Sequence, residues 1–225
     1  MENLIVPGEW VQLTPRVRRL TAPNPGMMTG PGTNSYVVGV NELALIDPGP
    51  AIESHIAALI AAVGNRLRYI LATHTHLDHS PAVRALKDAT GAAVLGMPAP
   101  PQANQDQSFA PDRVPVDGDM GAYLRSLEAL LSLDAGCIAP GHGHLIDRPH
   151  DEARKLIAHR LRREQKVLDG FATRNPATLD ELVAVVYADT PVKLHGAAKR
   201  SLYAHLLKLE ADARVMRDGE RWRLK

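Results

Sequence analysis

The 225-residue sequence lacks several features that secreted and membrane-spanning proteins require. A single cysteine, Cys137, excludes an internal disulfide, and its neighbours favour a small buried residue over a nucleophile. No run of about 18 apolar residues is present to span a membrane. Residues 1–13 have neither the basic start nor the apolar core of a signal peptide. From these absences we expect a cytoplasmic protein without a membrane segment.

Aromatic residues are also scarce, at 4% of the chain, which counts against binding of single-stranded nucleic acid by base stacking. Charges almost balance, with 26 Lys and Arg against 25 Asp and Glu, but they divide unevenly. Residues 1–150 hold 10 basic and 14 acidic side chains, whereas residues 151–225 hold 16 and 11. The resulting net charge of +5 on the second part is compatible with phosphate contacts, and it is also common on solvated surfaces.

The sequence does contain one dense group of metal-ligating side chains, in the heptapeptide Thr-His-Thr-His-Leu-Asp-His at residues 73–79. Its members are His74, His76, Asp78 and His79. Imidazole nitrogen and carboxylate oxygen are donors that zinc prefers. Burying this group without a cation would be difficult, because each imidazole needs a partner and the carboxylate cannot be left unpaired. We therefore predict a metal site here, whereas isolated histidines are expected to be hydrogen-bonded structural residues: His55, His159 and His205.

The residues on either side of the heptapeptide predict where it lies. Residues 67–72 are mostly apolar and suit a buried strand, and residues 82–89 suit a helix that Ser80 caps and Pro81 begins. The heptapeptide then occupies the loop at the end of a strand. In an extended segment His74 and His76 point to the same side, so both could reach one ion.

The heptapeptide resembles the His-x-His-x-Asp-His signature of the metallo-β-lactamase superfamily, and further segments extend the likeness in order. Residues 32–38 with the Asp-Pro-Gly turn at 47–49 resemble the family's opening strand pair and the turn that supports its site. The Pro-Gly-His-Gly sequence at 140–143 resembles a late loop whose histidine completes the second metal position. Residues 106–113 and 117–127 are similar to the β-lactamase-like protein 2 subgroup. The likeness covers most of residues 1–150.

This resemblance implies a ligand set that is incomplete in this chain. His74 and His76 would belong to one ion, and the other ion would take Asp78, His79 and His142. Only residues 114–116 separate two segments that several dozen residues separate in the family, and no histidine lies between His79 and His142. The third histidine of the first site and the bridging aspartate are thus missing. Asp117 or Asp119 could replace the bridge, although both are more typical of Asp-Gly turns. One zinc ion is expected, with two as the alternative.

The composition changes after His150, where we place the domain boundary. Residues 1–150 form the metallo-β-lactamase-like domain, and residues 151–225 form a second domain. The second part predicts helices at 151–168, 179–187 and 196–209, with Thr178 as the N-cap of the second, and two strands around a turn within 213–224. This pattern resembles the winged-helix domain of the β-lactamase-like protein 2 subgroup. The expected fold class is α+β: an αββα metallo-β-lactamase fold, shortened in its second half, followed by a small winged-helix domain.

The implied function is that of a zinc-dependent hydrolase in which a metal-bound hydroxide attacks an ester, a thioester or a phosphodiester. Asp78 would orient the attacking water and accept its proton. Because two expected ligands are missing, we expect reduced activity. The substrate would be a small-molecule ester or thioester, or RNA, and the strand edge that the missing segment exposes would favour a homo-oligomer.

Two alternatives remain open at the level of the sequence. The chain could be a catalytically dead pseudoenzyme whose winged helix binds nucleic acid or a protein partner, with salt-dependent and metal-independent affinity. It could also be a truncated product, which would pack loosely and aggregate.

Overall fold

The computed structural model describes residues 5–99, 105–112 and 120–225, and it divides the chain into two compact units. The first unit contains Met1–Asp117 and Ala139–Ile146, and the second contains Gly118–Ile138 and Asp147–Lys225. None of the helices in the described ranges is long and apolar enough to cross a membrane.

The first unit is built on a six-stranded sheet with the order β1-β2-β3-β4-β5-β6. Neighbouring strands from β1 to β4 run antiparallel, whereas β4, β5 and β6 run parallel. The strands are β1 (Trp10–Thr14), β2 (Val17–Thr21), β3 (Asn34–Gly39), β4 (Leu43–Ile46), β5 (Leu67–Leu71) and β6 (Ala93–Leu95). The predicted strand before the heptapeptide is therefore β5, and it ends two residues before residue 73.

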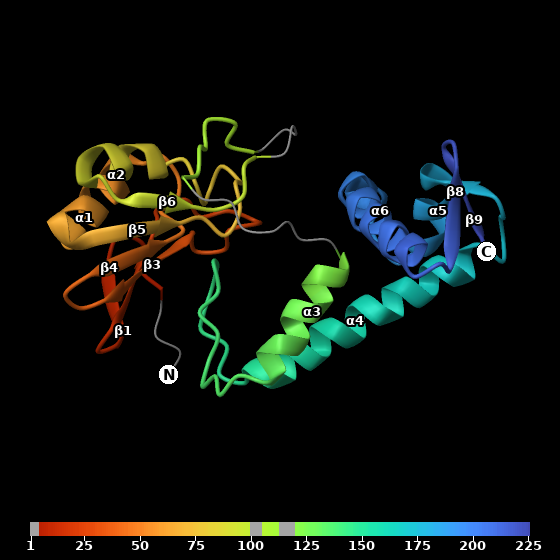
Figure 1. Cartoon of the computed structure of the whole chain (residues 1–225), viewed down its shortest axis with the longest axis horizontal. Helices are drawn as coiled ribbons and strands as arrows, with labels where there is room; N and C mark the ends of the chain where they lie inside the picture. Colours follow the sequence, from red (N-terminus) through yellow and green to blue (C-terminus); the bar gives the residue numbers. More distant parts are fainter. Residues whose placement is uncertain (1–4, 100–104, 113–119) are drawn as a thin grey trace. The chain divides into compact units, whose positions relative to one another are not determined.

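Two helices, α1 (Glu53–Val63) and α2 (Val83–Thr90), cover one face of this sheet (Figure 1). A 3₁₀ turn, η1 (Gly64–Arg66), links α1 to β5. Because side chains alternate along a strand, Val37 and Leu45 lie on the helix-covered face and belong to the buried core of the unit. Burial of this face against α1 and α2 holds the ends of β4 and β5 side by side.

The opposite face of the sheet is covered less completely. It carries the alternate residues Tyr36, Val38 and Ile46, of which Val38 and Ile46 are only part-buried. In the described ranges the first unit contains a single sheet, and residues 139–143 contact this second face. The contact includes the Tyr36 hydroxyl, which donates a hydrogen bond to the Pro140 carbonyl at 2.6 Å.

The second unit has the predicted winged-helix pattern of helices followed by a hairpin. Its helices are α3 (Met120–Leu131), α4 (Pro149–Gly170), α5 (Leu179–Val186) and α6 (His195–Ala211), with a 3₁₀ turn η2 (Val192–Leu194) before α6. Its sheet has the order β7-β9-β8, from β7 (Ala177–Thr178), β8 (Val215–Asp218) and β9 (Arg221–Leu224). Thr178 is the N-cap of α5 as predicted, and it forms a capping box with Glu181.

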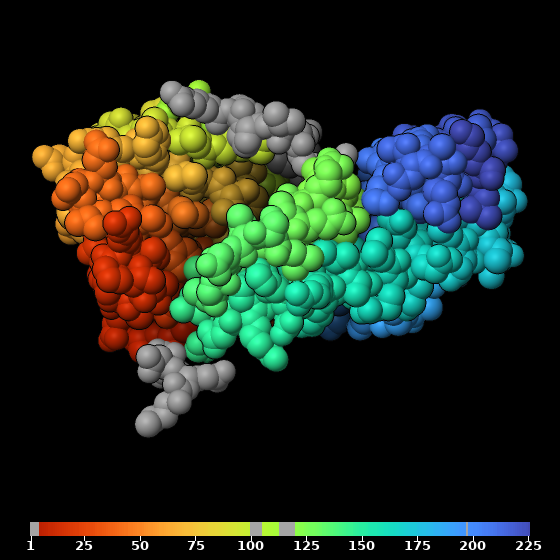
Figure 2. All heavy atoms as spheres, turned by 60° about the horizontal axis from the view of Figure 1, so that its bottom comes forward, coloured from red at the N-terminus to blue at the C-terminus, as the bar shows by residue number. Residues whose placement is uncertain are grey.

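The chain passes between the two units more than once. Asp147 begins the continuous part of the second unit, three residues before His150. Residues 118–138, which the sequence placed in the first domain, group with the second unit because α3 packs along α4 (Figure 2). Within that pair Arg160 of α4 lies over the ring of Tyr123 at 5.4 Å.

The expectation for Cys137 was wrong, because the structure places this residue on the surface. It lies in the irregular stretch between α3 and α4, where the neighbouring Asp134 and Gly136 are also exposed. No strand or helix orders this stretch, so its apolar residues do not share one buried face.

Candidate metal centre

The heptapeptide occupies the loop between β5 and α2. Hydrogen bonds to residues 105 and 106 hold this loop in place. Thr75 donates its hydroxyl hydrogen to Gln105 Oε1 at 2.7 Å, and the backbone of His76 pairs with Gln105. The Ser80 hydroxyl donates to the buried carboxylate of Asp106 at 3.1 Å. The predicted N-cap role of Ser80 was therefore wrong: Ala82 is the N-cap of α2 and makes no side-chain cap.

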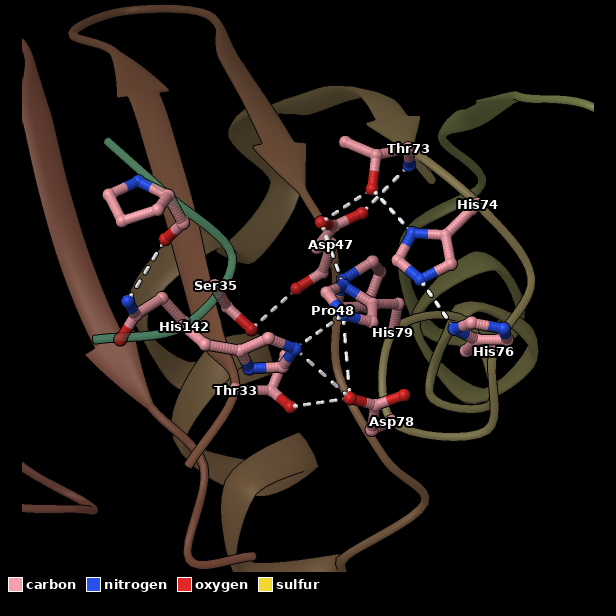
Figure 3. Close-up of polar contacts among 12 residues, drawn as sticks. Thr33, Ser35, Asp47, Pro48, Thr73, His74, His76, Asp78, His79 and His142 are labelled. Carbon is pink, nitrogen blue, oxygen red and sulfur yellow. Dashed lines mark hydrogen bonds and ion pairs between the residues drawn. The ribbon is translucent and has the colours of Figure 1, made fainter. Parts of the chain in front are cut away.

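Three predicted ligands converge on one point. Donor atoms of Asp78, His79 and His142 all lie within 4.8 Å of one another. The Nε2 atoms of the two imidazoles are 3.1 Å apart, and Asp78 Oδ2 lies 3.4 Å from His79 Nε2 and 3.3 Å from His142 Nε2 (Figure 3). The side chain of His79 is 3% exposed, whereas those of Asp78 and His142 reach solvent. The group of three donors is thus buried at His79 and open to solvent at Asp78 and His142.

The hydrogen bonds made by Nδ1 of His79 and of His142 determine which nitrogen of each imidazole can bind a metal ion. The Nδ1 atom of His79 lies 2.9 Å from the buried carboxylate of Asp47, and the Nδ1 atom of His142 lies 3.5 Å from the carbonyl of Gly32. A carboxylate and a carbonyl can only accept, so each Nδ1 carries a proton, and in the neutral imidazole each Nε2 then carries a lone pair. Two lone pairs and a carboxylate oxygen then face one another, and a shared cation relieves their repulsion.

This arrangement fits a divalent metal ion with nitrogen and oxygen ligands. The donor set of two imidazoles and one carboxylate occurs in catalytic zinc sites, which keep a further position open. The bond from Asp47 to His79 is the kind of outer contact that fixes the orientation of a metal-ligating histidine. The predicted supporting role of the Asp-Pro-Gly turn is borne out by this contact.

His142 reaches the centre because β3 holds its loop. The side-chain amide of Asn34 donates to the carbonyls of Pro140 and Gly143, each at 3.0 Å, and its backbone N–H donates to the Gly141 carbonyl at 2.8 Å. A Cβ atom at Gly141 would lie 2.8 Å from Cε1 of His79. Only glycine at this position lets the loop approach the imidazole so closely.

The other two predicted ligands, His74 and His76, bond to each other. His74 Nε2 and His76 Nδ1 are 2.9 Å apart, while His74 Nδ1 lies 3.0 Å from the hydroxyl of Thr73. Burial, with a smaller effect of the neighbouring charges of His79 and His76, lowers the pKa of His74 to about 4, so the imidazole is neutral at pH 7. In the described part of the chain the group of three close donors does not include this pair.

The candidate replacements for the bridging aspartate, Asp117 and Asp119, lie outside the described residues. Asp106 lies within the described residues. The sequence singled it out only as part of a segment that resembles the family, and in the structure its carboxylate has a structural role. Its carboxylate accepts hydrogen bonds from the backbone and the hydroxyl of Ser108 as well as from Ser80. It therefore braces the heptapeptide loop and does not face the centre.

Comparison with known proteins agrees with both halves of this description. Residues 28–104 match the model of the metallo-β-lactamase superfamily, and residues 178–222 match that of the β-lactamase-associated winged helix domain. The chain combines a metallo-β-lactamase domain with a β-lactamase-associated winged helix. Both the recognised family and the α+β fold class were predicted from the sequence.

Several known proteins align with nearly the whole chain. A β-lactamase-like protein 2 homolog from Drosophila melanogaster is 28% identical over 265 residues, covering 91% of each chain. An atrochrysone carboxyl ACP thioesterase from Aspergillus chevalieri is 29% identical, covering 91% of this chain and 84% of its own. A β-lactamase domain protein from Burkholderia ambifaria shares the fold, with a TM-score of 0.72 and 14% identity over 100% of this chain and 96% of its own.

The first of these alignments is longer than this chain. It extends over 265 residues, more than the 225 of this chain, so it includes positions at which this chain has no residue. The location of the shortening between Arg113 and Asp117 stays a prediction, because these residues lie outside the described ranges.

Sequence reasoning missed the polar residues of the metallo-β-lactamase domain that hold its loops together. Thr33, Asn34 and Ser35 are all buried, although they are polar and lead into an apolar strand. Asn24 bonds to both the backbone and the hydroxyl of Thr33, and that hydroxyl lies 3.5 Å from Asp78 Oδ2. Three consecutive polar residues at the start of a buried strand were the available signal, since buried polar groups need partners.

We expect Asp47→Asn to weaken zinc binding by about 10- to 100-fold, the range typical for outer partners of metal-ligating histidines. The asparagine keeps the size of the side chain but removes the negative charge that supports the proton on His79 Nδ1. Competition for zinc against a chromophoric chelator measures the change. Asp112→Asn is the matched control, because Asp112 pairs with Lys87 away from the centre and should leave the affinity within twofold. Equal affinities in Asp47→Asn and the wild type would contradict this role.

Proposed function

We propose that this protein is a metal-dependent hydrolase in which Asp78, His79 and His142 hold one divalent ion, with zinc as the expected metal. The observation that carries the proposal is the convergence of three lone-pair donors, two of them imidazole nitrogens whose tautomers other groups set. Three protein ligands are the usual number in a catalytic zinc site and leave a position for water or substrate. The incomplete pair His74 and His76 supports one ion over two.

A bound zinc ion supplies Lewis acidity, which lowers the pKa of water toward neutrality and polarises a substrate oxygen. The residues of the chain then have distinct tasks. Asp47 keeps His79 in the tautomer whose Nε2 faces the centre. Asp78, whose side chain is 27% exposed, faces both the centre and solvent, so it is placed to accept the proton that the attacking water loses.

The reaction class that we favour is hydrolysis of an ester or thioester. A relative that aligns over 91% of this chain is named as a thioesterase, which supports a carbonyl substrate. The loss of two expected ligands supports slow turnover, because a second ion would clamp the leaving oxygen. RNA phosphodiester cleavage is the less favoured substrate class for the same centre.

The winged helix offers limited support for a nucleic-acid substrate. On its hairpin, Arg217 lies over the ring of Trp222 at 5.6 Å and donates to the Gly219 carbonyl at 2.9 Å. Arg221 forms an ion pair with Glu181 at 3.5 Å. These two guanidinium groups are engaged within the unit, which reduces what they can offer to phosphates.

The test is elemental zinc analysis of the purified protein beside two single variants, His142→Ala and the matched control His74→Ala. We expect about one zinc per chain in the wild type and in His74→Ala, and loss of zinc in His142→Ala. Hydrolysis of a model thioester should fall at least 100-fold in His142→Ala, because its ion is lost. Equal zinc contents in the two variants would refute the assignment of the ligands. A zinc-loaded wild type without hydrolysis of thioesters, esters or phosphodiesters would refute the hydrolase.

A further inference from the structure

A cavity of about 540 Å³ adjoins the metal centre. Its volume lies within the range of about 300–1,000 Å³ that is typical of small-molecule sites. At one end it is lined by residues of the centre and its supports, including His74, His79 and His142. It continues along the second face of the sheet, the face that α1 and α2 do not cover (Figure 1).

The floor of this cavity is made by two cross-strand pairs of the sheet. Val17 of β2 lies opposite Val38 of β3, and Tyr36 of β3 lies opposite Ile46 of β4. All four line the cavity, and Ala139 adds a further apolar side chain. Because Val17, Val38 and Ile46 are only part-buried, their apolar surface remains available to a ligand.

The charges of the side chains that line the cavity indicate which kind of ligand can bind there. Among the described residues that line the cavity none is Lys or Arg, and the acidic side chain that lines it is Asp47. A nucleic-acid strand would bring phosphates into this space without a cationic side chain to meet them. A neutral apolar group, by contrast, would replace water on the valine and isoleucine side chains.

We propose that this cavity binds the apolar acyl group of the substrate, so that the protein hydrolyses esters or thioesters of medium-length aliphatic or similarly apolar acids. The acyl chain lies along the Val17–Val38 and Tyr36–Ile46 pairs, and its carbonyl carbon lies at the end of the cavity lined by His79 and His142. In the reaction water adds its oxygen to that carbon, the bond to the alcohol or thiol breaks, and the leaving group departs with a proton while the acid is released. The inference rests on the proposed hydrolase for its catalytic part.

The catalytic test compares zinc-loaded protein on acetyl, butyryl and octanoyl thioesters of N-acetylcysteamine. We expect kcat/KM to be at least tenfold higher for the octanoyl than for the acetyl thioester. Val38→Trp, which fills the cavity, should lower this ratio at least fivefold. Val40→Trp is the matched control, since Val40 is exposed and does not line the cavity, and it should keep the ratio. A flat dependence on acyl length in an active enzyme would overturn the proposal.

A binding test decides the same point without catalysis. Octanamide is neutral and carries the same apolar chain, and its binding to metal-free protein can be measured by titration calorimetry. We expect binding by the wild type and Val40→Trp, and at least tenfold weaker binding by Val38→Trp. If Val38→Trp does not fold, Val17→Phe fills the cavity from the paired position on β2. No binding, or binding that neither cavity variant weakens, would overturn the cavity assignment even if the zinc analysis succeeded. If octanamide binds but elemental analysis of the protein as purified finds no zinc, the cavity assignment stands and only the metal-dependent hydrolase is refuted.

Discussion

Asn34→Ala is expected to destabilise the first unit by about 3–5 kcal/mol, because it removes three hydrogen bonds made by one buried side chain. The Asn34 side chain is fully buried and donates to the carbonyls of Pro140 and Gly143. Its Oδ1 atom accepts a hydrogen bond from the buried hydroxyl of Thr21 at 2.7 Å. Alanine removes all three bonds. The Pro140 carbonyl keeps the Tyr36 hydroxyl as a donor, whereas the Gly143 carbonyl and the Thr21 hydroxyl lose these partners, at a cost of about 1–3 kcal/mol each where water cannot replace them.

The same substitution should release the loop that carries His142, so zinc affinity should fall together with stability. Urea unfolding of the zinc-free protein measures the first effect, and chelator competition measures the second. Tyr36→Phe is the control: it removes one hydroxyl and its bond to the Pro140 carbonyl, which should cost about 1 kcal/mol. A loss in Asn34→Ala no larger than that of Tyr36→Phe would show that the loop is held by other contacts.

His205→Leu is expected to stabilise the second unit, and more so in acid. His205 is fully buried among Leu202, Leu206 and Leu209, and within the described part of the chain neither ring nitrogen has a hydrogen-bond partner. Glu164 Oε2 is 3.8 Å from its Nδ1 atom, too far for a hydrogen bond. Leucine removes two unsatisfied polar atoms from this apolar core at little change in size.

The acid dependence follows from the pKa of His205. Burial, with smaller effects of the positive charges of Arg160, Lys208 and Arg163, lowers this pKa from 6.5 to about 4. The unfolded chain therefore takes up a proton below about pH 6.5 that the folded unit does not bind. The stability of the wild type is fully present above pH 6.5 and falls as the pH drops toward 4. The full loss from this group is about 3 kcal/mol.

This prediction can be measured on the second unit alone by tryptophan fluorescence. The chain has two tryptophans, so a Trp10→Phe background leaves Trp222, in the core of the second unit, as the reporter. Urea unfolding at pH 7.5, 5.5 and 4.5 should show the advantage of His205→Leu growing as the pH falls. His159→Leu, at an exposed position, should change the slope much less. An advantage independent of pH would mean that His205 is protonated in the folded unit.

Local sequence determined much of this protein. The apolar run before residue 73 forms β5, and Thr178 caps α5 with Glu181 three residues on, because strand burial and helix capping depend on near neighbours. The heptapeptide placed Asp78 and His79 one after the other at the end of that strand. The likeness of residues 140–143 to a family loop added His142, which no spacing rule could have joined to a residue 63 positions away.

Tertiary structure decided the rest, because those features depend on contacts between distant segments. The tautomer of His79 is set by Asp47, which follows β4 directly, and the position of His142 is set by Asn34 of β3. Three further features likewise have no signature in the local sequence: the hydrogen bond between His74 and His76, the surface position of Cys137 and the apolar cavity on the second sheet face. A residue type shows which atoms can bind, and only the packing of strands and loops brings those atoms within bonding distance.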